Sequence, residues 1–213
     1  MLTLSAWPGG FARLADPGRI ADRTRGQIAG FLRHDHDWRH HPGDLRLPGD
    51  TGLDIALVVE GDLTVDGFLD DHVTGLGLLV VLGDLVVGDL LSRGALHVGG
   101  DLRADGLVYG YYNDFTFEVA GAVHARALVL DDKFSHYRRG TLGAEIDAYE
   151  PTPEQLGAAR ELLVPEVYGE PGGRRRLWRR EEPPTLSRPD PRRVRERLHR
   201  GEPLFRAAAT GRS

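Results

Sequence analysis

An internal repeat with a period of about 20 residues constrains the fold of this chain more than any other feature. Four segments align on a central glycine, VVEGDLTVDG at 58–67, VVLGDLVVGD at 80–89, HVGGDLRADG at 97–106 and EVAGAVHARA at 118–127. A fifth, partial copy is HPGDLRLPG at 41–49. The spacings between the glycines are 18, 22, 17 and 21 residues, and the glycines are Gly43, Gly61, Gly83, Gly100 and Gly121. A period of this length with variable insertions is typical of a solenoid, in which each repeat is one coil.

Apolar residues recur at fixed distances from these glycines and alternate with polar ones, which predicts half-buried strands. Four and two residues before the glycine lie Leu57, Leu79, Leu96 and Phe117, and Val59, Val81, Val98 and Val119. Two and seven residues after it lie Leu45, Leu63, Leu85, Leu102 and Val123, and Phe68, Leu90, Leu107 and Leu128. A coil of this length fits three short strands joined by tight turns. We therefore predict a mainly β fold, a short parallel β-helix of about five coils, right-handed and triangular, over residues 41–148.

The glycine at each repeat start suits a corner with a positive φ angle or a close backbone approach, and Gly67 and Gly106 suit the next corner. The aspartates that follow would stack as like charges in successive coils, which destabilises a sheet. They are Asp44, Asp62, Asp84 and Asp101. The favoured reading is that each carboxylate caps backbone N–H groups at its corner. A cation-binding ladder is the alternative, although one aspartate column cannot supply the six to eight oxygens that calcium prefers.

The flanking regions are predicted to be caps that cover the open ends of the β-helix. Residues 1–40 form the N-terminal helical cap, with a helix expected over 20–32. Residues 149–213 form the C-terminal cap. There Thr152, Pro153 and Gln155 give a helix start with a capping box, and Asp190-Pro191 starts a second helix that ends at Gly201. The arginine-rich stretch 174–180 is read as a linker, with contact to nucleic acid or an acidic partner as the alternative.

Two polar or aromatic clusters are candidates for function. HDHDWRHH at 34–41 contains metal-ligand residue types, but its spacing matches no zinc pattern, so we expect a polar approach to the first coil rather than a metal site. The aromatic stretch 109–115 departs from strict alternation and predicts a protruding corner, beside the next corner at 131–137. Tyrosines are enriched at protein interfaces. The predicted partner-binding residues of this acidic aromatic face are Tyr109, Tyr111, Tyr112, Asn113, Asp114, Asp131 and Asp132.

Composition excludes several classes of protein. The 213 residues include no cysteine, so there is no disulfide framework, thiolate metal site or cysteine nucleophile. The net charge of −5, with −11 concentrated in residues 51–150, argues against a nucleic-acid binder. No apolar stretch is long enough for a membrane span and no signal peptide is visible, so a cytoplasmic location is expected. No nucleophile–base pair or phosphate loop is present, so we predict no catalytic residues, no metal and no cofactor.

The motifs GDLTVDG, GDLVVGD and GDLRADG resemble those of the bactofilins, polymer-forming bacterial cytoskeletal proteins with a right-handed triangular β-helix that assemble end to end. The corner at Tyr109 and the segment GEPLF at 201–205 also resemble an uncharacterised group of bacterial β-helix proteins, some of them in toxin–immunity neighbourhoods. The resemblance implies two functions. One is a non-enzymatic protein-binding β-helix, for example an immunity protein that occludes a toxin. The alternative is a cytoskeletal scaffold that self-associates. A groove enzyme, the third possibility, usually has many more coils.

Overall fold

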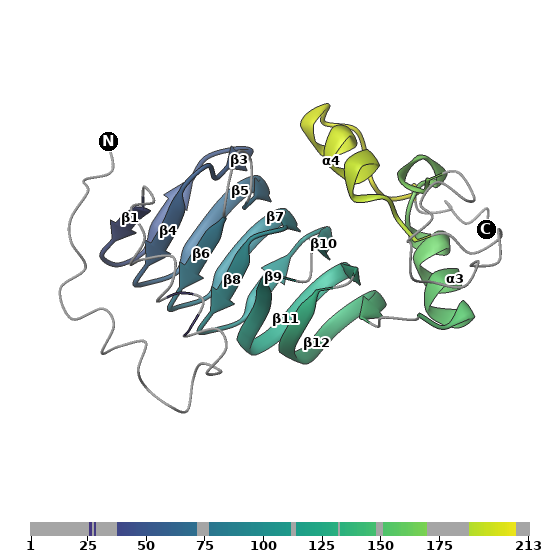
Figure 1. The fold of residues 1–213 in the computed structure, drawn as a ribbon. Coiled ribbons are helices and arrows are strands. Elements are labelled where there is room, and N and C mark those ends of the chain that lie inside the picture. The colour runs from purple at the N-terminus through teal and green to yellow at the C-terminus, as the bar shows by residue number, and fades with distance from the viewer. Residues whose placement is uncertain are drawn as a thin grey trace, which may run out of the picture.

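The computed structural model of the chain is a parallel β-solenoid followed by a small helical segment (Figure 1). It describes residues 38–71, 77–111, 114–131, 133–147, 151–169 and 188–207, together with Gly26 and Ile28. All strand pairs in its single sheet are parallel, as the repeat predicts. Neighbouring strands in this sheet come from successive coils.

Each coil contributes to three faces of the solenoid. The first face contains β1 (Trp38–His41), β4 (Ala56–Val59), β6 (Leu78–Val81), β8 (Ala95–Val98) and the starts of β11 (Thr116–Asp131) and β12 (Phe134–Asp147). The second contains β2 (Leu45–Leu47), the starts of β5 (Leu63–Asp70) and β7 (Leu85–Ser92), β9 (Leu102–Ala104) and the middles of β11 and β12. The third contains β3 (Thr51–Gly52), β10 (Leu107–Tyr111) and the ends of β5, β7, β11 and β12.

The predicted interior columns are confirmed for three of the four positions. Leu57, Leu79, Leu96 and Phe117 pair in register, as do the four valines two residues before the glycines and the residues two after them. The fourth prediction is confirmed for Leu90 and Leu128 and wrong for Phe68 and Leu107, and the strand register shifts between Val65 and Phe68. The inward column of the third face is instead Leu69, Leu90, Val108 and Leu128, whereas Phe68 and Leu107 point outward.

The solenoid has about six coils rather than the predicted five. The additional coil is β12, which pairs with β11 along most of its length. This coil lacks the glycine–aspartate motif and the apolar alternation of the others. It was therefore missed by a search for repeated sequence, although its backbone follows the same path.

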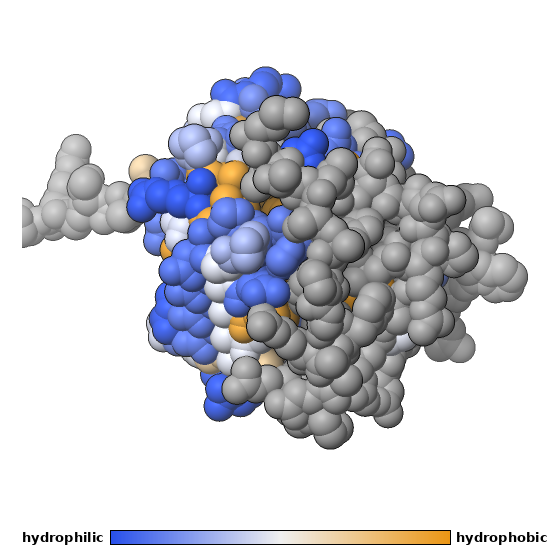
Figure 2. Space-filling view, turned by 90° about the vertical axis from the view of Figure 1, so that its left-hand side faces the viewer, coloured by the Kyte–Doolittle hydropathy of each residue, from blue (hydrophilic) through white to orange (hydrophobic). Residues whose placement is uncertain are grey.

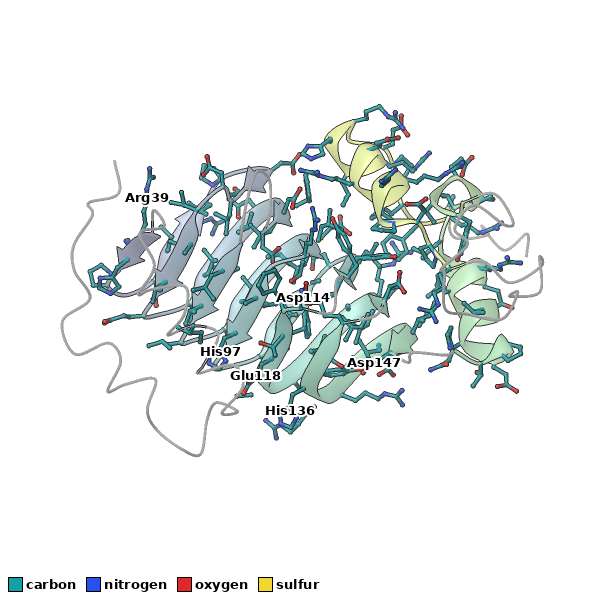
Figure 3. All side chains as sticks on the ribbon, viewed as in Figure 1. Arg39, His97, Asp114, Glu118, His136 and Asp147 are labelled. Carbon is teal, nitrogen blue, oxygen red and sulfur yellow. The ribbon has the colours of Figure 1, made fainter. Side chains whose placement is uncertain are left out.

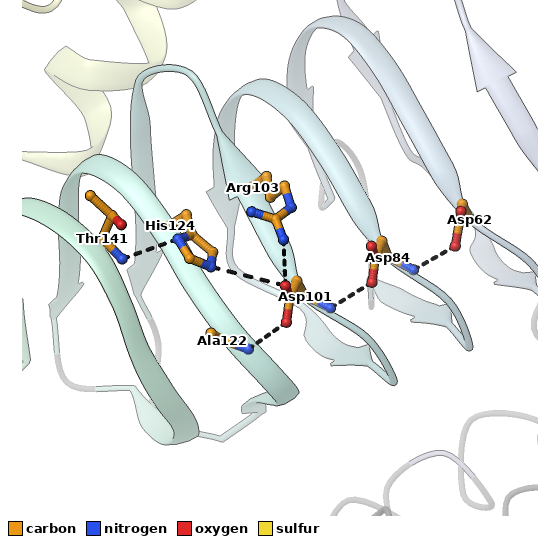
Figure 4. A network of polar contacts seen from close by, with 7 residues as sticks. All are labelled: Asp62, Asp84, Asp101, Arg103, Ala122, His124 and Thr141. Carbon is orange, nitrogen blue, oxygen red and sulfur yellow. Dashed lines mark hydrogen bonds and ion pairs between the residues drawn. The ribbon is translucent and has the colours of Figure 1, made fainter.

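The aspartates at the first corner connect each coil to the next, which confirms the capping interpretation (Figure 4). The Oδ1 atom of Asp62 accepts a hydrogen bond from the backbone N–H of Asp84 at 2.8 Å, and Asp84 accepts one from Asp101 at 2.8 Å. Asp44 and Asp101 make the same contact with Asp62 and Ala122. The corner glycines make room for it: a Cβ on Gly83 would lie 2.1 Å from Asp62 Oδ1. Close approach, rather than positive φ, therefore explains Gly83.

The second corner repeats this arrangement. Asp50 accepts from the backbone N–H of Phe68 at 2.9 Å, and Asp89 accepts from Leu107 at 2.6 Å. A Cβ on Gly67 or Gly106 would lie within 2.3 Å of these carboxylates, which confirms that both glycines serve this corner.

The C-terminal segment contains α3 (Pro153–Leu162), the short 3₁₀ helix η1 (Pro165–Val167) and α4 (Pro191–His199). Thr152 and Gln155 form the predicted capping box of α3. Asp190 caps α4, and Gly201 has a φ of +64° just after it. The predicted helix over 20–32 lies outside the described residues except at Gly26 and Ile28, and the arginine-rich stretch 174–180 lies wholly outside them. No helix in the described part of the chain is long and apolar enough to span a membrane.

Candidate partner surface

Two of the predicted partner-binding residues, Tyr109 and Asp131, contact the chain's own C-terminal segment. Tyr109 is fully buried, and its hydroxyl donates a hydrogen bond to the carbonyl oxygen of Pro189 at 2.7 Å. Burial raises the pKa of Tyr109 well above its ordinary value, so the hydroxyl keeps its proton and remains a donor. Asp131 forms an ion pair with Arg188, with Oδ1 and Nη1 2.5 Å apart and both side chains mostly buried. Residues 188 and 189 therefore occupy this part of the predicted face.

The remaining predicted residues are distributed around the same corner. Tyr111 pairs in register with Asp131, so the structure brings the two predicted corners together as expected. Its ring is half-buried, packs edge-on against Tyr109 and has the guanidinium of Arg93 6.0 Å from its centroid. Asp114 is exposed in the turn before β11 (Figure 3). Tyr112, Asn113 and Asp132 lie outside the described residues.

The third face as a whole is covered by the C-terminal segment. Its outward apolar side chains, among them Leu107, Val129 and Ile146, belong to one cluster with Leu156 of α3 and Val194 of α4. An ion pair and a ring contact also hold α4 on the third face. Arg195 Nε lies 2.8 Å from Asp70 Oδ2, and the ring of His199 packs edge-on against Phe68. The outward side of the third face is therefore buried by the C-terminal segment of the same chain.

The outward side of the first face is also buried, except at His136 in the last coil. Ala56, Val58, Leu78 and Val80 are at most 3 % exposed and cluster with the fully buried Ile28, which precedes the solenoid in sequence. His97, Glu118 and His136 follow one another on successive coils of this face (Figure 3). Burial lowers the pKa of His97, and the carboxylate of Glu118 opposes this effect.

The second face differs from the other two because its outward side chains are open to solvent. The side chain of Arg46 is 73 % exposed and that of Arg103 is 50 % exposed. Val86 is the one large hydrophobic residue classed as exposed in the described part of the chain, at 37 %. The outward column of this second face, each member three residues after a repeat glycine, is Arg46, Thr64, Val86, Arg103 and His124.

Rows of aspartates border the second face at both corners. Asp66 pairs with Arg46, with Oδ1 and Nη2 2.7 Å apart, and Asp101 pairs with Arg103 at 2.5 Å. The hydrogen bond from the backbone N–H of Ala122 lowers the pKa of Asp101, and Arg103 lowers it further. The carboxylate of Asp101 therefore remains negatively charged at neutral pH. Residues 51–150 as a whole have a net charge of −11.

His124 is held in one orientation on this surface (Figure 4). Its Nδ1 atom accepts a hydrogen bond from the backbone N–H of Thr141 at 3.1 Å, so in the neutral ring the proton is on Nε2. Nε2 points toward the carboxylate of Asp101, 4.0 Å away. Because Nδ1 is already bonded to the backbone, the ring is fixed as a donor at its outer edge.

Figure 2 looks onto the end of the solenoid that carries the first coil. The described surface there is mainly hydrophilic, with a few apolar patches between polar side chains. The first coil contributes partly exposed Leu45 and Leu47, which pack against the interior. Of the histidine-rich stretch, residues 34–37 lie outside the described part. His40 is buried 3.2 Å from Glu60, and His41 lies 2.9 Å from the carbonyl oxygen of Asp44.

Lys133, the sole lysine, was missed by the sequence reasoning because nothing in its local pattern marks it as buried. Its Nζ donates to the carbonyl oxygens of Gly94 at 2.6 Å and Ser92 at 3.2 Å. Burial lowers its pKa to about 8. The carboxylate of Asp71 accepts from the Ser92 hydroxyl at 2.6 Å and from two backbone N–H groups, so this cluster fastens the third corner.

Sites for metals or small molecules are not evident in the described ranges. No group of three or more histidine, aspartate or glutamate residues could hold a metal ion there. One hollow of about 500 Å³ lies between η1 and α4 and is lined by Arg192, Arg193 and Glu196 among others. A second, of about 360 Å³, lies between α3 and the middle of β12. Both are lined by charged side chains that are at least partly exposed.

Comparison of the chain with protein-family models, with curated proteins and with solved structures finds no match.

Proposed function

We propose that the protein is a non-enzymatic binding solenoid, and that another protein docks on its second face. One observation carries the proposal: among the described residues, most outward side chains of the first and third faces are buried, whereas those of the second face are exposed or partly exposed. A flat parallel sheet held by its own corner hydrogen bonds offers a rigid surface. Rigid surfaces lose little conformational entropy on binding.

The charge of the second face favours a basic partner. Aspartates line both of its corners, and the repeat region has a net charge of −11. Complementary potentials accelerate encounter and select the partner. Arg46 and Arg103 are already paired with carboxylates of this chain, so the surface offers a charged rim around Thr64 and Val86 rather than a uniformly acidic patch. Steric occlusion of a basic toxin, as an immunity protein achieves it, is one concrete form of this function.

This proposal moves the partner surface away from the residues expected first. Tyr109 and Asp131 hold the C-terminal segment on the third face and so contribute to binding only indirectly. Tyr111 is partly exposed and Asp114 is exposed, so both can add to the contact with a partner. The proposal includes no catalytic step, metal or cofactor.

The test is a comparison of two arginine substitutions at exposed small or branched apolar residues. Val86→Arg places a bulky cation in the centre of the second face, and Ala158→Arg adds the same charge on the exposed side of α3. We expect Val86→Arg to reduce recovery of specific co-purifying proteins at least tenfold and Ala158→Arg to leave it unchanged. Equal recovery with both variants, in folded protein, would refute binding at this face.

A second function, a bactofilin-like scaffold that assembles lengthwise, is favoured by the first coil. There Leu45 and Leu47, inward residues of the first coil in the described part of the chain, remain partly exposed. This alternative expects a molar mass that rises steadily with protein concentration and falls when Leu47 is replaced by aspartate.

A further inference from the structure

The last coil carries polar side chains at most of the inward positions that are apolar in the coil before it. Its strand β12 pairs with β11, whose inward residues in the fifth coil are apolar. In the β11–β12 register, most of these apolar residues pair with a polar or charged residue of β12. The pairs are Phe117 with Ser135, Val123 with Arg139, Ala125 with Leu142, Leu128 with Glu145 and Leu130 with Asp147. Four of these five interior positions therefore change from apolar to polar or charged.

These polar side chains bond to one another across the interior. The Ser135 hydroxyl donates to Asp147 Oδ1 at 3.0 Å. The Tyr137 hydroxyl lies 2.6 Å from Asp147 Oδ2 and 2.7 Å from Glu145 Oε1, and Arg139 pairs with the other oxygen of Glu145. The ring of Tyr137 packs edge-on against Phe117, so this end layer closes directly over the apolar core. Burial and the neighbouring Asp147 raise the pKa of Tyr137, so the hydroxyl stays protonated within the network.

We infer that this end layer, consisting of Ser135, Tyr137, Arg139, Glu145 and Asp147, prevents a second copy of the chain from stacking on the C-terminal end of the solenoid. A further coil on β12 would cover two carboxylates and a guanidinium that now reach water at the rim. Covering such groups with an apolar layer costs more than their mutual attraction returns. The first coil keeps the inward leucines Leu45 and Leu47 on the second face, whereas on the first face Arg39 and His41 pair in register with the inward Leu57 and Val59.

The position of α3 supports the same conclusion. The helix contacts β12, and Gly143 of β12 approaches the side chain of Leu162. The hollow of about 360 Å³ between them is lined by Arg139 and Glu145 of the end layer and by Glu154 of α3. Figure 1 shows α3 beyond β12, on the side away from β11. Charged side chains of the end layer and of α3 thus border the region that a stacked coil would enter.

The main experiment gives two positions of the last coil the residues of the fifth coil. In the double variant Glu145→Leu with Asp147→Leu, both positions carry leucine, as do their register partners Leu128 and Leu130. We expect light scattering to show a molar mass that rises with concentration for this variant and a constant mass for the unsubstituted protein. The control Asp66→Leu with Asp105→Leu makes the same change at exposed positions and should leave the mass constant. A folded Glu145/Asp147 variant that keeps the unsubstituted mass, or a control that associates equally, would overturn the inference.

A second measurement keeps the inference testable if that variant fails to fold. The chain has no cysteine, so Ser135→Cys introduces a single thiol in the end layer with little change of shape. Under mild oxidation, alone or mixed with Leu47→Cys protein, it should form intermolecular disulfides no faster than Asp105→Cys, which places the thiol at an exposed corner in the middle of the solenoid. Faster cross-linking through position 135 would mean that the C-terminal end is an interface between copies.

Discussion

The carboxylate of Asp84 accepts a hydrogen bond from the backbone N–H of Asp101, its counterpart in the next coil, at 2.8 Å. The same bond joins Asp62 to Asp84, so the aspartate column is a chain of side-chain to backbone contacts. Stacked like charges repel, but each carboxylate here satisfies a corner N–H that would otherwise lack a partner. The repeated aspartate therefore stabilises the stacking of coils.

Replacing Asp84 should test this role. We expect Asp84→Ala to lower the free energy of unfolding by about 1 kcal/mol, because the N–H of Asp101 loses its acceptor while the repulsion from neighbouring carboxylates also falls. Urea unfolding followed by circular dichroism measures the change. The control is Asp105→Ala, whose side chain is exposed at the next corner and should change stability by less than about 0.5 kcal/mol. Equal effects would contradict a specific capping role.

Replacing the corner glycine Gly83 by alanine should destabilise the fold, whereas replacing Gly157 in α3 should not. A Cβ on Gly83 would lie 2.1 Å from Asp62 Oδ1 and 2.8 Å from the backbone of Gly61, so Gly83→Ala should cost about 2 kcal/mol or more. Gly157 has nothing within 4 Å of its Cβ position, and Gly157→Ala should raise stability by about 0.5–1 kcal/mol through helix propensity. Thermal unfolding distinguishes the two, and a loss of similar size at both sites would disprove the close-approach explanation.

Lys133 predicts an unusual dependence of stability on pH. Its pKa is lowered by burial from 10.5 to about 8, so between these values the unfolded chain binds more protons at this residue than the folded one. Stability contributed by Lys133 should therefore rise as pH increases from about 8 to about 10. Urea unfolding across this range should show the free energy of unfolding of the unsubstituted protein rising relative to that of Lys133→Met. A difference between the two proteins that stays constant with pH would mean that the folded chain does not lower the pKa of this lysine.

Tyr109 should hold the C-terminal segment through a single buried hydroxyl. In Tyr109→Phe the carbonyl oxygen of Pro189 loses its donor in a buried place, which should cost about 1–2 kcal/mol. Amide exchange at Asp190, whose N–H donates to the carbonyl of Val167, should accelerate. Tyr111→Phe is the matched control, because that ring is half-exposed and its stability effect should be small. Unchanged exchange at Asp190 in Tyr109→Phe would show that the apolar cluster alone holds the segment.

Much of the fold could be predicted because equivalent residues of successive repeats occupy equivalent positions in the solenoid. Val59, Val81 and Val98 share one column, and identical spacing from a glycine was enough to align them. The last coil could not be found in this way, because its interior is polar: Glu145 and Asp147 stand where leucines stood before. The register shift between Val65 and Phe68 was equally hard to predict, because Phe68 and Leu69 are both apolar and the sequence does not say which of them points inward.

The candidate surface was harder to predict than the fold. Tyr109 and Asp131 were recognised as neighbours, but their contact with residues 188 and 189 joins positions about 60 to 80 residues apart that no pattern relates. Which face stays exposed depends on where the flanks pack, and this follows from tertiary contacts alone. The exposed column did carry a signal, since Arg46, Thr64 and Arg103 each lie three residues after a repeat glycine. The sequence does not show that this column is exposed, because its exposure depends on which faces the flanking segments cover.

The most direct test of the central claim is photo-cross-linking in the cell that makes the protein. A photoreactive amino acid is placed at Val86 or Thr64 on the second face, or at Ala158 on α3 as the control. We predict a discrete adduct of one mass from both second-face positions and none from Ala158. Adducts from Ala158 alone, or none from the second face while the protein remains folded, would contradict the proposal that this face binds a protein partner.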